Sequence, residues 1–216
     1  MHLSWYGQSC FKIQTKNATI VVDPFDRAAT GLEPPRSKAD VVVFTHKHAD
    51  HTSGEYKNAE FTISGPGEYE VRGVHFYGFP VSHDDVGGKR LGFTAAFLIE
   101  ADDLRILHLG DLGAKNLSSE QIEELGDVDI MLVPIGGTYT LDAEDAEKLV
   151  RNIEPHVVIP MHYALPRLKI KLDGVDKFLR EMGAAKKEAL PKYMVKKKDL
   201  PPEGTEVVVL ELATGE

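Results

Sequence analysis

The sequence predicts an α/β protein built around buried β-strands. Short runs rich in β-branched and aromatic residues fill its first half, and strands alternate with helical patterns in its second half. Hydrophobic residues make up 42% and charged residues 27% of the 216 positions, a balance typical of globular proteins and not of disordered or fibrous chains. A chain of this length can bury one substantial core, so we expect residues 1–216 to form a single domain.

The first half contains seven predicted strands bounded by turn-forming residues. In order they are Leu3–Tyr6, Cys10–Thr15, Ala18–Val22, Val41–Thr45, Phe61–Ser64, Val71–Val81 with a break, and Thr94–Glu100. Three prolines and a glycine between Asp23 and Asp40 predict a long loop, and loops of that length are often functional. The stretch HDDVGGKRLG, residues 83–92, predicts a second and flexible loop.

In the second half, predicted strands alternate with helices. The strands are Ile106–Leu109, Ile130–Val133, Val157–Pro160 and Val207–Leu212. Ser118 and Gln121 form a capping box at the start of one helix, and Gly126 ends it. Asp142 caps a second helix, which Pro155 follows, and a third runs from Gly174 to Met182. The lysine-rich residues 196–199 predict a solvated loop.

Charge and cysteine usage restrict the partners and the compartment. A formal charge of −9 argues against broad attachment to nucleic acid or to an anionic membrane. The single cysteine, Cys10, excludes an intramolecular disulfide, and the first residues lack the basic and apolar regions of a signal peptide. No apolar run reaches the length of a membrane span. We therefore expect a cytoplasmic protein without a membrane partner.

Ligand-type side chains follow several of the predicted strands. In open α/β sheets the ends of strands meet at one crevice, so residues that are distant in sequence come together there. Histidines spaced by one residue lie on a turn, and such a turn can serve two metal positions. Imidazole and carboxylate groups suit zinc, and also iron or manganese. The residues that follow strands in this way are His46, His48, Asp50, His51, His83, Asp111 and His162.

Each of these histidines taken alone is compatible with an ordinary hydrogen-bonded residue. The complete set favours a metal site, because so many polar groups at buried strand ends would be costly without a cation. Five further residues have two interpretations. His108 is either a partner that orients a ligand or a core residue. Lys89 and Arg90 either reach a substrate anion or are solvated, and Tyr139 and Tyr163 either stabilise an oxyanion or only pack.

Residues 45–51, THKHADH, resemble the signature of the metallo-β-lactamase fold superfamily, and His83, Asp111 and His162 follow in the expected order. The segments WYGQSCF, VVDPF and PIGGTYTLDAEDA are similar to the small Zn-dependent hydrolases related to ascorbate-phosphate lactonases. This resemblance implies a four-layered αββα sandwich, with two mixed sheets flanked by helices. It also implies one metal on His46, His48 and His83, a second on Asp50, His51 and His162, and Asp111 as the bridge.

The sequence departs from this superfamily at a few positions. Gln8 stands where many relatives have histidine, Gly137 stands where some have an acid, and His83 is followed by DDVGG and not by a Thr-Pro-Gly-Ser turn. These changes keep the ligands but leave the substrate open. His48 occupies the place of a glutamate in the flavin-partnered diiron reductases, which disfavours redox chemistry.

The predicted function is metal-dependent hydrolysis of an ester, lactone or phosphodiester bond in a small metabolite. Two divalent metals, zinc first and manganese or iron as alternatives, would share a hydroxide, and Asp50 would take up a proton. The metals make the pocket locally positive, which is compatible with an anionic substrate. The alternatives are a nuclease, disfavoured by the short segment between Asp111 and His162, and a mononuclear iron dioxygenase. A binding protein without activity would lack some ligands. The oligomeric state stays open.

Overall fold

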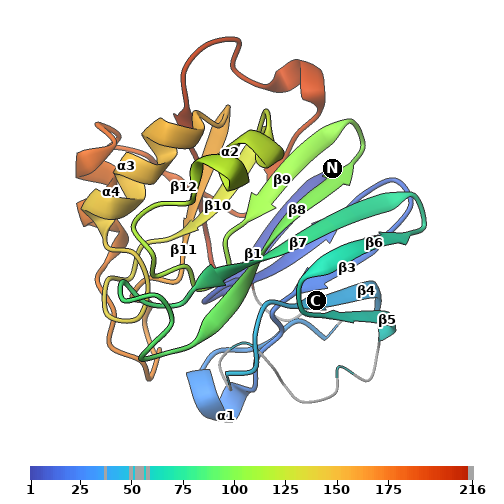
Figure 1. The fold of residues 1–216 in the computed structure, drawn as a ribbon, viewed down its shortest axis with the longest axis horizontal. Coiled ribbons are helices and arrows are strands. Elements are labelled where there is room, and N and C mark those ends of the chain that lie inside the picture. Colours follow the sequence, from blue (N-terminus) through green and yellow to red (C-terminus); the bar gives the residue numbers. More distant parts are fainter. Residues whose placement is uncertain (37, 49–50, 52–55, 57–58, 214–216) are drawn as a thin grey trace.

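Most of the strands form two mixed sheets that face each other, and two short strands form a third, small sheet (Figure 1). The computed structural model describes residues 1–36, 38–48, 51, 56 and 59–213. Within them, one sheet has the order β13-β1-β2-β3-β4-β5 and the other the order β14-β11-β10-β9-β8-β7-β6. The first comprises β1 (His2–Gly7), β2 (Cys10–Gln14), β3 (Thr19–Val22), β4 (Ala39–Phe44), β5 (Ala59–Ser64) and β13 (Tyr193–Met194). The second comprises β6 (Gly67–Val71), β7 (Val74–Ser82), β8 (Phe93–Ala101), β9 (Leu104–His108), β10 (Ile130–Pro134), β11 (Val157–Met161) and β14 (Glu206–Val207).

The direction of the strands brings several carboxyl ends to the same edge of the second sheet. β7 and β9 both pair antiparallel with β8, so they run in the same direction. β10 pairs parallel with β9 and with β11, which continues that direction. Loops that follow β7, β9 and β11 therefore lie together, which is the arrangement that builds sites in α/β sheets.

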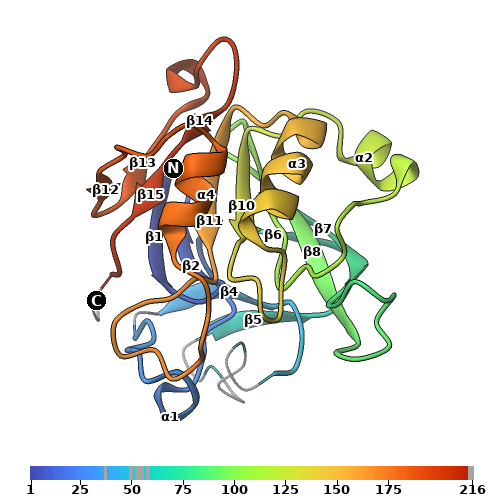
Figure 2. The same cartoon turned by 90° about the vertical axis from the view of Figure 1, so that its left-hand side faces the viewer.

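Helices cover the outer faces of the sheets. Helices α2 (Ser119–Leu125), α3 (Ala143–Ile153) and α4 (Val175–Glu181) lie over the second sheet (Figures 1 and 2). On the other side, α1 (Arg27–Thr30) is the only helix within the described residues. Loop residues complete the cover there, where Phe25 and Leu32 pack with Tyr6 and Phe44. The predicted αββα sandwich is confirmed, with a reduced helical layer on one side.

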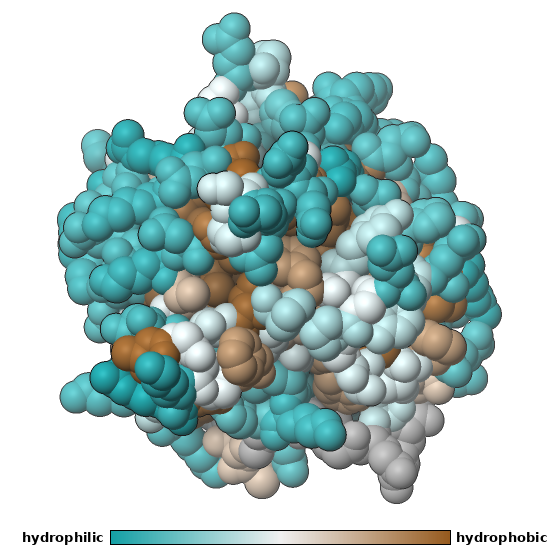
Figure 3. All heavy atoms as spheres, in the orientation of Figure 1, coloured by the Kyte–Doolittle hydropathy of each residue, from teal (hydrophilic) through white to brown (hydrophobic). Residues whose placement is uncertain are grey.

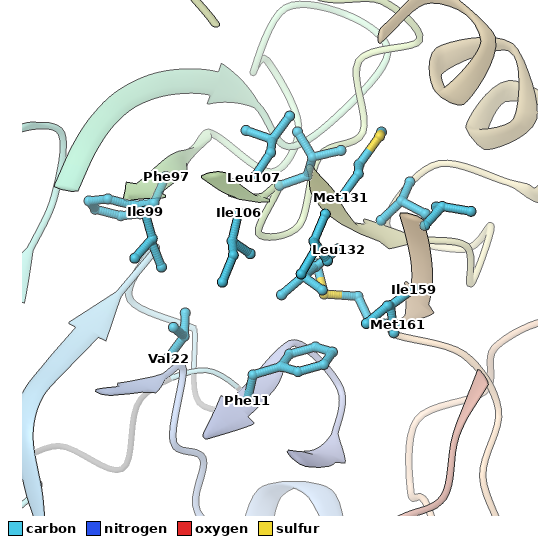
Figure 4. Packing of buried hydrophobic residues seen from close by; sticks show 14 of the residues in the cluster. Phe11, Val22, Phe97, Ile99, Ile106, Leu107, Met131, Leu132, Ile159 and Met161 are labelled. Atoms are coloured by element: carbon cyan, nitrogen blue, oxygen red, sulfur yellow. The ribbon is translucent and has the colours of Figure 1, made fainter. Parts of the chain in front are cut away.

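The main core lies between the two sheets. In Figure 4, Phe11 and Val22 of the first sheet point toward Ile106 and Leu132 of the second. Their neighbour Met131 points to the opposite face, on the side of the helices. Strands buried on both faces are apolar at nearly every position, which explains why β10 and β11 are continuous hydrophobic runs. Each such side chain stabilises the fold by about 1.5–3 kcal/mol.

Local signals for the helices agree with the structure. The capping box of Ser118 and Gln121 is present, Gly126 ends α2, and the Asp142 side chain accepts a hydrogen bond from the backbone N–H of Asp145. The segment between residues 23 and 40, predicted to be one long loop, contains the short helix α1, which was not predicted. Asp26 caps this single turn by accepting from the N–H of Ala28.

Two predictions near the carboxyl terminus are wrong in part. The single strand expected over Val207–Leu212 divides in two: β14 pairs with β11, whereas β15 (Val209–Leu210) pairs with β12 (Ala189–Leu190). The lysine-rich residues 196–199 are exposed, but they are not simply a solvated loop, because Lys197–Asp199 form a short 3-10 helix, η1. The Nζ atom of Lys197 lies 2.7 Å from Oδ1 of Asp129, a carboxylate with no exposed surface, and thereby compensates its buried charge.

The surface in the orientation of Figure 1 is mostly hydrophilic, with apolar residues gathered near its centre (Figure 3). No helix within the part of the chain that the structure describes is long and apolar enough to cross a membrane.

Candidate metal centre

Four chain segments deliver ligand-type side chains to one place at the ends of strands. The first follows β4, where a turn closes as the N–H of His51 donates to the carbonyl of His48 at 3.0 Å. The others follow β7, β9 and β11. Together they bring six of the seven predicted ligands into one cluster: His46, His48, His51, His83, Asp111 and His162. Asp50, the seventh and the predicted catalytic residue, lies outside the described residues.

The Oδ2 atom of Asp111 lies at the centre of this cluster. Imidazole Nε2 atoms surround it, at 2.9 Å for His51, 3.3 Å for His162, 3.4 Å for His83 and 3.9 Å for His46. His48 is more exposed than the other ligands, and its Nδ1 lies 3.0 Å from Nε2 of His46.

In His83 and His51 the second ring nitrogen is held by a neighbour. Nδ1 of His83 donates to the carbonyl oxygen of Tyr139 at 3.1 Å, and Nδ1 of His51 lies 3.2 Å from Oδ2 of Asp23. With the proton on Nδ1, both rings direct their Nε2 lone pairs toward the centre. Such second partners fix both the tautomer and the orientation of a metal-binding imidazole.

The charge state of the cluster agrees with this assignment. Burial lowers the pKa of His83, and burial together with the His51 ring lowers the pKa of His46 to about 3. These imidazoles are therefore neutral at pH 7. Burial by itself would raise the pKa of Asp111, but His162 and His51 hold it well below its ordinary value, so the carboxylate is ionised.

This arrangement fits divalent metal ions. Nε2 atoms of His51, His162 and His83 lie 2.9–3.4 Å from one buried, ionised carboxylate oxygen, and a set of donors this close together can surround a cation. Nitrogen and oxygen donors suit zinc, and also manganese or iron. Two groups have ligand atoms within 4.8 Å of one another: His46 with His48 and His83, and His46 with His51 and Asp111. The first group is the predicted trio for the first metal.

Asp23 is a functional residue that the sequence reasoning missed. Its carboxylate is fully buried and accepts from the backbone N–H of Thr45 at 2.8 Å and from the Thr45 hydroxyl at 2.7 Å. The Thr45 oxygen in turn lies 3.0 Å from Nδ1 of His46. Asp23 therefore positions His51 directly and His46 through Thr45. Its only sequence signal was the motif VVDPF.

The turn between β1 and β2 supplies two further supports. The hydroxyl of Ser9 donates to Oδ1 of Asp111 at 2.9 Å, and the side-chain nitrogen of Gln8 lies 3.1 Å from Nε2 of His162. His108 braces this turn, since its Nε2 lies 2.8 Å from the carbonyl oxygen of Ser9 while its Nδ1 accepts from the N–H of Gly110. Of its two interpretations, the geometry favours the orienting role.

Backbone conformations around the centre are unusual. Gln8, Asp23 and His162 adopt positive φ values of 48°, 47° and 53°, in the left-handed region that non-glycine residues rarely occupy. Backbone strain from such positive φ values is often found at functional sites, and it persists only where the surrounding structure stabilises the strained conformation.

The other candidate residues have different environments. Tyr139 is 45% exposed and lines a cavity with His48, His83 and Asp111, whereas Tyr163 is buried against Trp5 with ring centroids 4.8 Å apart. Arg90 lies 3.7 Å from Asp85 on the surface, and Lys89 is exposed. Cys10 is buried among apolar residues.

The loop at residues 83–92, which was expected to be flexible, is organised by Asp84. Its carboxylate accepts four backbone hydrogen bonds, from Val86, Gly88, Arg90 and Leu91.

Comparisons with known proteins identify the family of this chain. The model of the β-lactamase superfamily domain matches residues 2–162. A UPF0173 metal-dependent hydrolase of Salinibacter ruber is 30% identical over 213 residues, and the match covers 85% of this chain and 94% of the relative. A UPF0173 protein of Pyrococcus abyssi is 33% identical over 187 residues, and the match covers 76% of this chain and 83% of the relative. The crystal structure of a metallo-β-lactamase superfamily protein from Thermotoga maritima matches with a TM-score of 0.80 and 34% identity over 100% of this chain and 99% of that one. The chain therefore belongs to the metallo-β-lactamase superfamily and to its family of metal-dependent hydrolases.

Proposed function

We propose that this protein hydrolyses an ester, lactone or phosphodiester bond of a small metabolite at a centre of two divalent metals. His46, His48 and His83 would hold the first metal, and Asp50, His51 and His162 the second, with Asp111 between them. The observation that supports this is the convergence of imidazole nitrogens on one buried carboxylate oxygen. When bound, two such cations, zinc in the first place, supply Lewis acidity and a water that ionises near pH 7.

The residues of the chain have separate tasks in this mechanism. Ser9 occupies Oδ1 of Asp111, which leaves Oδ2 toward the imidazoles of His51, His83 and His162, where it would be available to a metal. Asp23 fixes the rings that face that oxygen from the β4 side. Uptake of the proton by Asp50 stays a prediction, because this residue lies outside the described ones. The nucleophile is made without a serine or cysteine.

The size of the site favours a small substrate. The cavity beside His48, His83 and Asp111 has a volume of about 220 Å³, smaller than a pocket for a drug-sized molecule. Between Asp111 and His162 the chain forms α2, β10, α3 and β11, with no element left to grip nucleic acid. The net charge of −9 also disfavours binding to nucleic acid. We further propose that the protein acts in the cytoplasm.

The position of His51 favours this function over a mononuclear dioxygenase. The dioxygenase alternative leaves His51 without metal. Its ring is fully buried, however, held by Asp23 on one side and aimed at Asp111 on the other. Such a buried and oriented imidazole is expected of a ligand.

Metal analysis combined with a substrate panel tests the proposal. We expect about two zinc ions per chain, and metal-dependent cleavage of at least one ester, lactone or phosphodiester. His48→Ala should lose the first metal and most of the activity. His75→Ala is the matched control, because His75 is exposed at the far end of β7 and should leave both properties unchanged. Full activity in His48→Ala, or activity without metal, would contradict the mechanism.

A further inference from the structure

The cavity at the metal centre has an apolar wall. Three of the residues that line it are the candidate ligands His48, His83 and Asp111, and the remaining described ones are Leu91, Tyr139 and Ile170. They come from three different loops, after β7, β10 and β11. Leu91 and Ile170 are half-buried and Tyr139 is 45% exposed, so all three are accessible from the cavity. Among the described residues that line the cavity, no lysine or arginine is present.

This wall is attached to the metal ligands by hydrogen bonds. The N–H of Leu91 donates to Oδ2 of Asp84 at 2.8 Å, and Asp84 directly follows His83. On the other side, the carbonyl of Tyr139 accepts from the ring of His83. Leu91 and Tyr139 are therefore held in fixed positions relative to one ligand. Such a preorganised wall binds an apolar group without a large ordering cost.

The neighbouring pocket offers little to an anionic group. It has a volume of about 410 Å³ and shares His83, Leu91 and Tyr139 with the apolar cavity. Its described lining includes two cations, and each already faces a carboxylate. Nζ of Lys115 lies 2.9 Å from Asp145, and Arg90 lies 3.7 Å from Asp85. The same lining carries four aspartates against these two cations, so a phosphate there would meet an excess of negative charge.

We propose that Leu91, Tyr139 and Ile170 form a pocket for the acyl chain, and that the substrate is a neutral ester or lactone with an aliphatic acyl group. This inference rests on the proposed function and selects among its substrate classes. In the reaction, the oxygen of water bonds to the carbonyl carbon, the bond from that carbon to the ester oxygen breaks, and the departing alkoxide takes the proton. An acid and an alcohol result, without an oxidant or reductant.

The wall predicts a dependence on acyl chain length. Each buried methylene contributes about 0.8 kcal/mol, which corresponds to roughly a fourfold gain in affinity. From acetyl to hexanoyl, four methylenes are added, so kcat/KM should rise by up to about two orders of magnitude until the cavity is full. Leu91→Ala and Ile170→Ala should each lower the hexanoyl-to-acetyl ratio by about tenfold, since they remove part of the wall.

The experiment has two independent readouts on the zinc-loaded protein. The first is hydrolysis of 4-nitrophenyl acetate, butyrate and hexanoate beside bis(4-nitrophenyl) phosphate. The second is calorimetric binding of acetohydroxamate and hexanohydroxamate, which needs no turnover. Leu91→Ala and Ile170→Ala are compared with Met194→Ala, which removes a 64% exposed apolar side chain on β13. Because Leu91 and Ile170 are only half-buried, both variants are expected to fold, and circular dichroism checks this.

The outcomes separate the pocket from the proposed function. The inference is supported if both readouts rise with chain length in the wild type and in Met194→Ala, and lose most of that rise in the two wall variants. It is overturned if hexanohydroxamate binds no better than acetohydroxamate, or if the phosphodiester is the preferred substrate. If nothing is hydrolysed but the chain-length dependence of binding stands, the proposed function fails and the apolar pocket remains.

Discussion

Gly113 lies against the backbone of His83, and its replacement by alanine should displace that ligand. A Cβ atom added at this position would lie 2.5 Å from the carbonyl oxygen of His83, 2.6 Å from its carbonyl carbon and 2.7 Å from the nitrogen of Asp84. Ordinary contacts of a Cβ atom begin at 3.4 Å. All three obstructing atoms belong to the backbone, so no change of rotamer relieves the clash. The backbone at His83 must therefore move by about 1 Å.

The size of the effect follows from this displacement. A misplacement of ~1 Å in a catalytic constellation can cost about 100-fold in rate. Forcing a methyl group into a packed site also destabilises a protein by about 1–3 kcal/mol. We therefore expect Gly113→Ala to bind zinc more weakly, to lose about 100-fold in kcat/KM, and to unfold at a lower temperature. Competition with a chelator, steady-state kinetics and thermal unfolding measure the three effects.

A second glycine provides the control. A Cβ atom at Gly174 would meet no atom within 4 Å, so Gly174→Ala should retain metal affinity and activity. Gly136→Ala should behave like Gly113→Ala, because its added Cβ would collide with the carbonyl oxygen of His162. If Gly113→Ala bound zinc and turned over substrate like Gly174→Ala, the close approach to His83 would have no role in placing the ligand, and the geometric reasoning would be refuted.

Three further predictions concern residues that support the centre. Asp84→Asn should loosen residues 83–92, because the amide keeps only one acceptor oxygen for four backbone N–H groups. Hydrogen exchange of these four N–H groups should become faster in the variant. Unchanged protection of them would contradict the prediction. Asp23→Asn should weaken zinc binding by about 10–100-fold through loss of the carboxylate partner of His51, measured by chelator competition. Burial lowers the pKa of His108 below 6.5, so the unfolded state binds more protons and stability should fall as the pH drops below 6.5. Denaturant unfolding should show a smaller fall in His108→Gln, and an equal fall would count against His108 as its source.

The strands that carry the ligands were predictable because their sequence pattern has a single physical cause. β10 and β11 are buried on both faces, so they are apolar throughout, and the predicted strands at 130–133 and 157–160 differ from them by one residue at one end. Such a pattern does not show which strand pairs with which. Val207 and Val209 look alike in the sequence, yet they belong to strands that join different sheets. A four-residue helix such as α1 is likewise too short to show a helical period.

The metal ligands could be proposed from their residue type, their position after a strand and the resemblance to the superfamily. The residues that hold these ligands by hydrogen bonds could not be proposed in this way. Ser9 and Asp111 are 102 positions apart, and Asp23 and His51 are 28 apart, so no local spacing connects them. The loop at Asp84 was misjudged for a related reason. Its glycines predicted flexibility, whereas in the folded chain they allow backbone N–H groups to gather around one carboxylate.

The metal centre lies at the junction of the two sheets, and this position couples metal binding to sheet packing. The histidines that follow β4 belong to the first sheet, whereas His83, Asp111 and His162 belong to the second. Hydrogen bonds already cross this junction, from Ser9 to Asp111 and from the N–H of Ala95 to the carbonyl of Thr45 at 2.9 Å. Cations bound to ligands of both sheets would hold the sheets in one relative position, and the core between them would hold the ligands apart at the distance that the cations need. The free energy of metal binding and that of folding would therefore be linked in this protein, because the same arrangement satisfies both.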